Sequence, residues 1–234
     1  MHAMILAAGR GERMRPLTDR RPKPLLEAGG KPLIVWHLEA LATAGFRDVV
    51  INHAHLGGMI EEALGDGSQW RLRLSYSAEE PALETAGGIA RALPRLGTRP
   101  FLVLNGDVSC DFPLARAHTI ATQMRAASLL AWCVLVPNPP HHREGDFGLR
   151  DGLLEAAPEF VGVPPSGRLT FSGIGVYDPA LFRGLGGDEP ARLAPLLRKA
   201  AEARRCGAER HDGRWIDVGT PERLAALDAQ LRSG

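Results

Sequence analysis

Leu6-Ala-Ala-Gly-Arg-Gly-Glu-Arg-Met-Arg-Pro-Leu-Thr18, with Lys23-Pro-Leu25 shortly after it, directly follows the apolar run His2-Ala-Met-Ile-Leu6. That run predicts a buried first strand, so the glycines and cations stand where a strand delivers its loop. Between residues 10 and 23 there are six cations and two acids, an excess of four positive charges in a chain whose net charge is +1. Gly9 and Gly11 allow backbone N–H groups to approach an anion closely. The stretch therefore predicts a phosphate-binding loop.

The loop differs from two other well-known phosphate-binding motifs. A dinucleotide-binding fingerprint needs a third glycine at position 14, where this chain has Met14. A Walker loop needs Gly-Lys followed by Ser or Thr, and the sequence contains no such tripeptide. A dehydrogenase is disfavoured further because no suitably placed acid follows the first predicted helix.

Length and composition indicate a single globular domain. The chain has 234 residues, of which 44% are hydrophobic and 24% are charged, as in an ordinary globular protein. This length suits one large α/β domain, which we expect to span residues 1–234. The near-neutral net charge argues against a general nucleic-acid binder.

The three cysteines, Cys110, Cys133 and Cys206, are widely spaced and form no C-x-x-C pair. A disulfide framework and a zinc site are both disfavoured, which is consistent with a reducing cytosol. The N-terminus has no signal-peptide pattern, and no apolar run has the length of a membrane span. We expect a cytoplasmic protein and, because no long apolar surface stretch is evident, a monomer.

Strand and helix patterns alternate through the first half of the chain. Strands are predicted at 2–6, 48–52, 71–77 and 101–105, and helices at 32–45, 56–64 and 83–94. Strands that alternate with helices form parallel sheets covered on both faces. We therefore expect an α/β fold with a mostly parallel central sheet and helices on both faces.

The second half has a different pattern. A buried strand is predicted at 127–136, a long polar loop at 137–147, and helices at 191–204 and 221–231. Short segments at 147–154 and 169–177 predict antiparallel strands that form a small lid over the sheet. His141 and His142, in the polar loop, are expected to be solvated rather than to bind metal, because adjacent side chains diverge.

Two aspartates are candidate metal ligands. Asp107 follows the strongly apolar strand 101–105, at the end where open α/β sheets bind their ligands. Asp217 lies within Trp215-Ile-Asp-Val-Gly-Thr220. Mg²⁺ prefers oxygen ligands and usually sits between one or two carboxylates and phosphates. Each aspartate taken alone also suits a helix cap or a turn.

The loop pattern Leu-Ala-Ala-Gly-x-Gly-x-Arg-Met-x-Pro-Leu-Thr followed by Pro-Lys-Pro-Leu resembles the signature of the sugar-1-phosphate nucleotidyltransferases, or NDP-sugar pyrophosphorylases. The resemblance covers the chain from residue 2 to about residue 230. It implies the Rossmann-like nucleotide-diphospho-sugar transferase fold with a small antiparallel sugar-binding lid. It also implies that a sugar 1-phosphate attacks a nucleoside triphosphate, with Mg²⁺ as cofactor and pyrophosphate as leaving group.

The same resemblance implies the roles of individual residues. Arg13 and Lys23 would be the catalytic residues that neutralise phosphate charge, and Asp107 with Asp217 would bind Mg²⁺. The implied nucleotide-binding residues are Leu6, Ala8, Gly9, Gly11, Glu12, Arg13, Lys23, Gly88 and Asn105. The implied sugar-binding residues are Glu84, Asp146, Ser172 and Gly173.

Within the family, four segments most resemble the uridylyltransferases of bacterial cell-wall recycling, which use UTP and N-acetylmuramate 1-phosphate. These segments are Ile51-Asn-His-Ala54, Leu83-Glu-Thr-Ala-Gly-Gly88, Pro139-Pro-His-His-Arg-Glu-Gly-Asp-Phe147 and Leu169-Thr-Phe-Ser-Gly-Ile174. The lysine that commonly follows a Glu in hexose-specific relatives has no counterpart near Glu155 or Glu159. The resemblance therefore favours UTP and the muramate as substrates.

Two alternatives stay open. The nearest is a mannose-1-phosphate guanylyltransferase or another hexose-1-phosphate nucleotidyltransferase. From a different class, the chain could be a catalytically silent sugar-nucleotide sensor. Such a sensor has no need to keep Arg13, Lys23 and both candidate metal aspartates, and this chain has all four.

Overall fold

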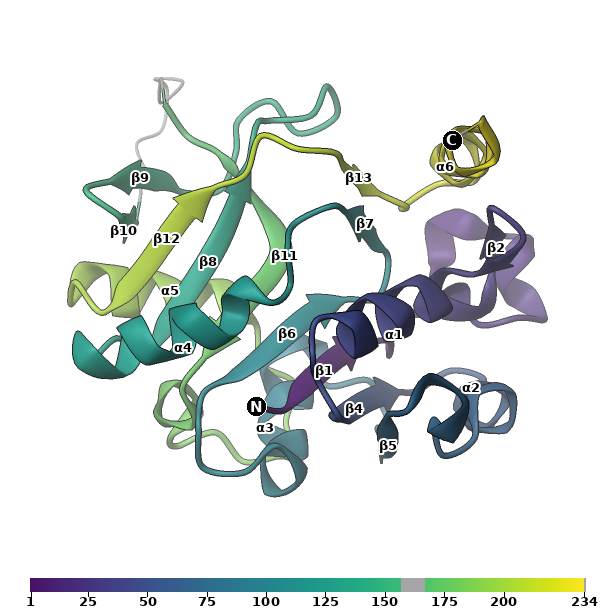
Figure 1. Ribbon diagram of the computed structural model, residues 1–234, viewed down its shortest axis with the longest axis horizontal. Helices are drawn as coiled ribbons and strands as arrows, with labels where there is room; N and C mark the ends of the chain where they lie inside the picture. The colour runs from purple at the N-terminus through teal and green to yellow at the C-terminus, as the bar shows by residue number, and fades with distance from the viewer. Residues whose placement is uncertain (157–166, 234) are drawn as a thin grey trace.

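A nine-stranded mixed sheet runs through the computed structural model, which describes residues 1–156 and 167–233 (Figure 1). Glu159 lies outside these residues. The strands lie in the order β5 (Arg73–Ala78), β4 (Asp48–His53), β1 (Ala3–Leu6), β6 (Phe101–Asn105), β11 (Thr170–Tyr177), β8 (Ala131–Val136), β12 (Cys206–Arg210), β10 (Leu153–Glu155) and β9 (Gly148–Arg150). Strands β5, β4, β1 and β6 are mutually parallel, which confirms the prediction for the first half of the chain.

The antiparallel strands of the second half join this sheet. Strand β11 pairs antiparallel with both β6 and β8, and β9 and β10 extend the far edge next to β12. The segments 147–154 and 169–177 are thus antiparallel, as expected. However, β11 is a central strand instead of part of a lid, because its apolar side chains are buried on both faces.

Helices cover both faces of the sheet (Figure 1). The core on one face includes residues of α1 (Leu33–Thr43), α2 (Gly57–Leu64) and α4 (Arg116–Ala126). The core on the other face includes residues of α3 (Glu84–Leu96) and α5 (Leu193–Glu202). The side chains of β1 alternate between these cores: Ala3 and Ile5 face one, and Met4 faces the other. Burial on both faces explains why this strand has a continuous apolar sequence.

A smaller core joins the C-terminal helix to the N-terminal loop. Met14 and Leu26 from the loop pack with Val218 and with Leu227 of α6 (Pro221–Ser233). The amide of Gly29, beside the two-stranded sheet of β2 (Glu27–Ala28) and β3 (Lys31–Pro32), donates a 2.8 Å hydrogen bond to Asp228 of α6. The last helix therefore supports the loop that follows β1.

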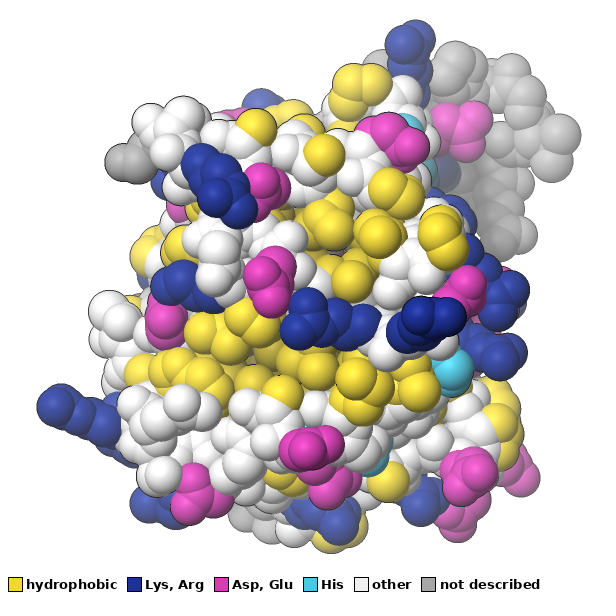
Figure 2. All heavy atoms as spheres, turned by 90° about the vertical axis from the view of Figure 1, so that its right-hand side faces the viewer, with side chains coloured by type: hydrophobic (Ala, Val, Ile, Leu, Met, Phe, Trp, Pro, Cys, Tyr) yellow, Lys and Arg dark blue, Asp and Glu magenta, His cyan; other side chains and the backbone are white. Residues whose placement is uncertain are grey.

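Figure 2 shows the side of the molecule on which α6 and α2 lie, where hydrophobic side chains gather between basic and acidic ones. Leu17 and Met59 are the large hydrophobic residues with the most exposed surface among the described residues. The expected monomer stays a prediction. Over the described ranges, no helix combines the length and apolar character that crossing a membrane requires.

Several elements were not predicted. Helix α4 and strand β12 form in segments to which we assigned no element from the sequence. Strands β7 (Val108–Cys110) and β13 (Trp215–Asp217), which were also not predicted, pair in a short antiparallel ladder. Strand β8 begins at Ala131 instead of residue 127, because Ala127 ends α4 and Ser128 has a positive φ of 54°. The β7–β13 ladder matters most, because it carries the segment after Asp107 to the segment that holds Asp217.

Candidate active site

The loop after β1 turns tightly at Gly11. This residue has a φ of +65°, and its carbonyl accepts hydrogen bonds from the Met14 amide at 2.9 Å and the Thr18 hydroxyl at 2.8 Å. A Cβ at Gly11 would lie 2.9 Å from the methyl group of Thr18. Gly9, by contrast, has open space around it. Gly11 therefore shapes the loop, and Gly9 leaves room for a ligand beside it.

A cavity of about 370 Å³ opens at the carboxyl ends of β1, β4 and β6. It lies where open α/β sheets bind their ligands. Its lining includes seven residues singled out from the sequence: Leu6, Ala8, Gly9, Lys23, Glu84, Asn105 and Asp107. It also includes Asn52, Glu79 and Thr85, which were not among the assigned site residues.

A buried hydrogen-bond network forms the floor of this cavity. The side chain of Asn52 accepts a 2.8 Å hydrogen bond from the Ala7 amide and donates one of 2.7 Å to Glu79. Glu79 also accepts from the Leu83 amide at 2.8 Å. A Cβ at Gly88 would collide with the carboxylate of Glu79 and lie 2.8 Å from the Asn52 amide nitrogen. Gly88 thus lies behind the cavity and leaves space for the network that shapes it.

A second cavity, of about 340 Å³, adjoins the first. Asn105 and Asp107 line both cavities, so the two meet at the end of β6. The other lining residues are Arg13, Val108, Pro139, His141, His142, Thr170, Phe171, Ser172, Gly173, Trp215 and Asp217. The predicted metal aspartates, the predicted catalytic Arg13 and the predicted sugar-binding Ser172 and Gly173 therefore share one cavity.

Both aspartates are held next to cations. The ammonium of Lys23 lies 2.5 Å from Oδ2 of Asp107, and Lys23 is only 8% exposed. Asp217 forms an ion pair with Arg223, lies 3.4 Å from Nε2 of His141 and accepts a 3.1 Å hydrogen bond from the Gly219 amide. Two carboxylates on the wall of one polar cavity are an oxygen donor set that suits Mg²⁺.

The residues predicted to bind sugar do not all lie in one cavity, because Glu84 lines the first cavity and the other three lie in or beside the second. Ser172 and Gly173 line the second cavity, and Gly173, with a φ of +81°, lies so close to Asn105 that a Cβ would be 2.7 Å from its amide nitrogen. The carboxylate of Asp146, in contrast, does not line either cavity. It accepts a 2.8 Å hydrogen bond from the Phe171 amide and lies 3.0 Å from His142 Nε2. Asp146 thus positions two residues of the cavity wall.

The histidines of the polar loop are not simply solvated. His141 and His142 both line the second cavity, and each lies beside a different aspartate. Arg223, which donates a 2.7 Å hydrogen bond to His141, also was not predicted. Its only sequence signal is its place in the first turn of α6, a few residues after Asp217. Glu12 is exposed in the loop and lines neither cavity.

His37 of α1 lies near the carboxyl end of β6. Burial lowers the pKa of its imidazole to about 4, although the charge of Asp107 and a hydrogen bond with the Gly106 backbone act in the opposite direction. His37 is therefore neutral at pH 7 and contributes no positive charge near Asp107.

Comparisons with known proteins agree with this geometry. The model of the nucleotidyl transferase family matches residues 2–234. The chain is 51% identical to the N-acetylmuramate alpha-1-phosphate uridylyltransferase of Neisseria meningitidis serogroup B, over 98% of this chain and 97% of that protein. It is 32% identical to the mannose-1-phosphate guanyltransferase of Schizosaccharomyces pombe, but that alignment covers only 62% of the yeast protein and 95% of this chain.

Solved structures show the same fold. The chain matches a UDP-glucose pyrophosphorylase complexed with UDP-glucose at a TM-score of 0.76 and 20% identity, over 99% of this chain and 98% of that one. The match to an apo UDP-glucose pyrophosphorylase has a TM-score of 0.74 at 18% identity. The predicted fold class is thereby confirmed. By the extent of its sequence match and by the residues gathered around its two cavities, this chain belongs to the nucleotidyl transferase family.

Proposed function

We propose that this protein transfers a uridylyl group from UTP to N-acetylmuramate 1-phosphate and releases pyrophosphate. The observation that carries the proposal is the 51% identity to the Neisseria uridylyltransferase along nearly the full length of both chains. The corresponding protein of Caulobacter vibrioides is 34% identical over 98% of this chain and 96% of its own length. The proposed setting is the recycling of cell-wall sugars in the cytoplasm.

The two cavities suit the two substrates. The larger cavity would bind the nucleotide against Leu6, Ala8 and Gly9, with the buried Asn52–Glu79 pair below. The smaller cavity would bind the sugar against Ser172 and Gly173. Because both cavities include Asn105 and Asp107, a phosphate group from each substrate would meet at the end of β6.

Charge neutralisation is the main task of the protein at this meeting point. A phosphate monoester is already an anionic nucleophile near neutral pH, so its oxygen attacks the α-phosphorus of UTP in line without a protein base. Lys23 would place its ammonium group between the reacting phosphates, and Arg13 would bind the triphosphate and the leaving pyrophosphate. Such preorganised charges stabilise the transition state without reorganisation during the reaction.

Asp107 and Asp217 would hold the divalent cation, for which we propose Mg²⁺. When bound, the ion supplies positive charge to the phosphate oxygens and orients the triphosphate. The cationic partners of the two aspartates, Lys23 and Arg223, keep both carboxylates in place. His142 and Phe171, positioned by Asp146, would contact the sugar.

The experiment that tests the proposal measures pyrophosphate release with Mg²⁺ for UTP, GTP, dTTP and CTP, each paired with N-acetylmuramate, mannose or glucose 1-phosphate. Release with UTP and the muramate above all other pairs is expected. The best rate with GTP and mannose 1-phosphate would instead favour the guanylyltransferase alternative. The 32% identity to the Schizosaccharomyces pombe mannose-1-phosphate guanyltransferase is the reason to test it. Tight sugar-nucleotide binding without turnover would favour a sensor.

A further inference from the structure

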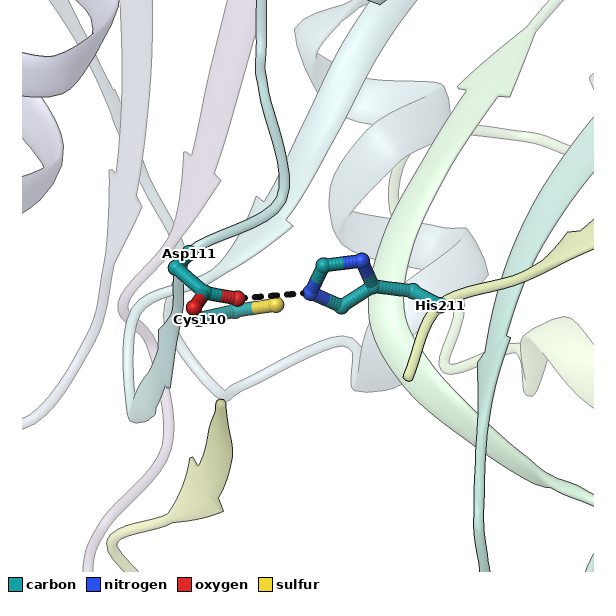
Figure 3. A group of neighbouring side chains, drawn as sticks. All are labelled: Cys110, Asp111 and His211. Carbon is teal, nitrogen blue, oxygen red and sulfur yellow. Dashed lines mark hydrogen bonds and ion pairs between the residues drawn. The ribbon is translucent and has the colours of Figure 1, made fainter. Parts of the chain in front are cut away.

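Three side chains with metal-binding atoms meet outside the active site (Figure 3). Cys110 ends strand β7, Asp111 follows it, and His211 follows strand β12. The sulfur of Cys110, a carboxylate oxygen of Asp111 and a ring nitrogen of His211 all lie within 4.8 Å of one another. None of these residues lines the two cavities of the active site. In the part of the chain that the structure describes, no other group of three such residues is this compact.

The three donor atoms are held in place by their surroundings. The ring of His211 contacts Phe112 edge-on, with 5.6 Å between ring centroids, and the His211 amide donates a 2.8 Å hydrogen bond to the Leu135 carbonyl. The Asp111 amide donates a 3.1 Å hydrogen bond to the carbonyl of Arg214. The site is therefore assembled before any ion arrives, which lowers the cost of binding.

Glycine at position 213 is needed beside the cluster. A Cβ on Gly213 would collide with the carboxylate of Asp111 and lie 2.5 Å from Nε2 of His211. The chain therefore passes close enough to these two side chains to hold them together, and only a glycine leaves them this space.

The charges of the cluster favour a cation once the thiol loses its proton. Although burial opposes it, hydrogen bonds from Arg214 and His211 lower the pKa of Asp111, so its carboxylate is ionised at neutral pH. Arg214 lies 3.3 Å from Oδ2, which leaves Oδ1, 2.7 Å from His211 Nε2, facing the cluster. Burial raises the pKa of the Cys110 thiol to about 11, so a bound metal ion would have to displace a proton into solvent.

We propose that Cys110, Asp111 and His211 bind one divalent cation of the Zn²⁺ type, with water as a fourth ligand. One thiolate, one imidazole and one carboxylate form a ligand set that Zn²⁺ accepts in tetrahedral geometry. The hard cations Mg²⁺ and Ca²⁺ prefer oxygen ligands only, so this site and the aspartate pair of the active site select different ions.

The position of the site indicates a structural role. Cys110 pairs with Trp215 at one end of the β7–β13 ladder, and Asp217 pairs with Val108 at the other. An ion that links β7 to His211 closes a loop around this ladder, since His211 lies just before β13 in the chain. The ion would therefore stabilise the ladder on which Asp107 and Asp217 depend for their positions.

Cobalt substitution tests the proposal directly, because a Co²⁺–thiolate bond gives a charge-transfer absorption that carboxylate sites lack. The full-length protein, reduced and stripped of metal, is titrated with Co²⁺ and then with Zn²⁺. We expect a charge-transfer band that saturates at one equivalent, visible bands typical of tetrahedral Co²⁺, and loss of both when Zn²⁺ displaces the Co²⁺. Binding of Co²⁺ to Asp107 and Asp217 adds no such band.

Variants identify the ligands. Cys110→Ser and His211→Gln should each remove the charge-transfer band and weaken Zn²⁺ binding by at least about 100-fold, since loss of outer-sphere partners alone costs about 10–100-fold. The control Cys206→Ala, whose buried sulfur lies 3.9 Å from that of Cys133, should keep the band. Circular dichroism shows which variants are folded, and either ligand variant alone suffices for the test. No charge-transfer band in the wild-type protein, or an unchanged band in a folded ligand variant, would overturn the proposal.

Discussion

The backbone amide of Val218 donates a 2.7 Å hydrogen bond to the carbonyl of Asp107. This bond continues the β7–β13 ladder, in which Asp217 pairs with Val108. Backbone hydrogen bonds thus bring Asp107 and Asp217, which are far apart in the sequence, to one cavity. The positions of the two carboxylates therefore do not depend on side-chain packing alone. The ladder would hold the proposed cation site in place before an ion and a triphosphate bind.

The aspartates themselves give the first prediction. Asp107→Asn and Asp217→Asn each remove one negative charge while keeping the shape of the side chain. We expect kcat for Mg²⁺-dependent pyrophosphate release to fall by about 100-fold or more, since removal of one preorganised electrostatic group costs about 10²–10³ in rate. Asp212→Asn, which alters an exposed ion pair with Arg210, is the control and should keep wild-type turnover. Wild-type kcat and Mg²⁺ dependence in both active-site variants would refute the metal assignment.

Lys23 gives the second prediction. Its ammonium is buried against Asp107, so Lys23→Ala removes a cation from the meeting point of the cavities and leaves the carboxylate without this partner. We expect kcat to fall by about 10²–10³-fold. Lys31→Ala is a matched control, because Lys31 also pairs with a carboxylate, that of Glu39, but lies away from both cavities. If the substitution of Lys23 raised only the KM for the sugar phosphate, its proposed role at the reacting phosphates would be wrong.

The third prediction concerns Asp146. Asp146→Ala frees the Phe171 amide and His142 from their shared partner, so the wall of the cavity proposed to bind the sugar loosens. A charge-assisted hydrogen bond contributes about 1.5–3 kcal/mol, which corresponds to a rise of about 10–100-fold in the KM for the sugar 1-phosphate. The KM for the nucleotide should stay unchanged. Asp151→Ala, in the exposed turn between β9 and β10, is the control. A change confined to the nucleotide KM would mean that Asp146 serves the other substrate.

Gly88 gives the fourth prediction. Gly88→Ala places a methyl group against Glu79 and Asn52, whose hydrogen bonds form the floor of the cavity proposed to bind the nucleotide. We expect a loss of about 1–3 kcal/mol in the free energy of unfolding and a higher KM for the nucleotide. Gly58→Ala is the matched control, because Gly58 is also helical but has open space around it, and its stability should rise by about 0.4–1 kcal/mol. Urea unfolding of both variants measures the difference, and equal stabilities would contradict the steric argument.

Local signals were sufficient to predict much of the fold. The apolar runs at β1, β4 and β6 are buried on both faces of the sheet, and Pro32 and Gly45 bracket helix α1 as expected. The β7–β13 ladder could not be predicted in this way. Its strands have three residues each, which is too short for a periodic pattern, and they pair over a long sequence separation. Strand β11 was placed in a lid instead of the central sheet, because an apolar segment indicates burial but not the neighbours of a strand.

The residues of the candidate site could likewise be predicted only where a local sequence signal marks them. Residues of the loop after β1 and the end of β6 were predicted because each stands next to a recognisable strand. Asn52 also ends a predicted strand, but its role in the site depends on its hydrogen bond to Glu79, which lies near it only in the folded chain. His141 meets Asp217 across the fold, and no spacing in the sequence records that contact. Arg223 lies only a few residues after Asp217, but its ion pair with Asp217 and its hydrogen bond to His141 become visible only in the folded chain.

The last prediction concerns the pH dependence of stability. Burial lowers the pKa of His37 in the folded protein from its ordinary value of 6.5 to about 4. As the pH falls through this window, the unfolded chain binds a proton that the folded protein does not, so the folded state loses stability. Between pH 7 and pH 5 the contribution of this one residue is a loss of about 2 kcal/mol. Its contribution to the pH dependence fades as the pH rises more than about one unit above 6.5.

His37→Gln removes this titration, so the variant should lose about 2 kcal/mol less than the wild type between pH 7 and pH 5 in urea unfolding. Only the difference between the two pH profiles counts, because the substitution also changes stability at every pH. An NMR titration of the His37 imidazole gives an independent measurement in the folded protein. An imidazole that titrates near pH 6.5, together with parallel stability profiles, would show that α1 and the end of β6 do not exclude solvent from this side chain.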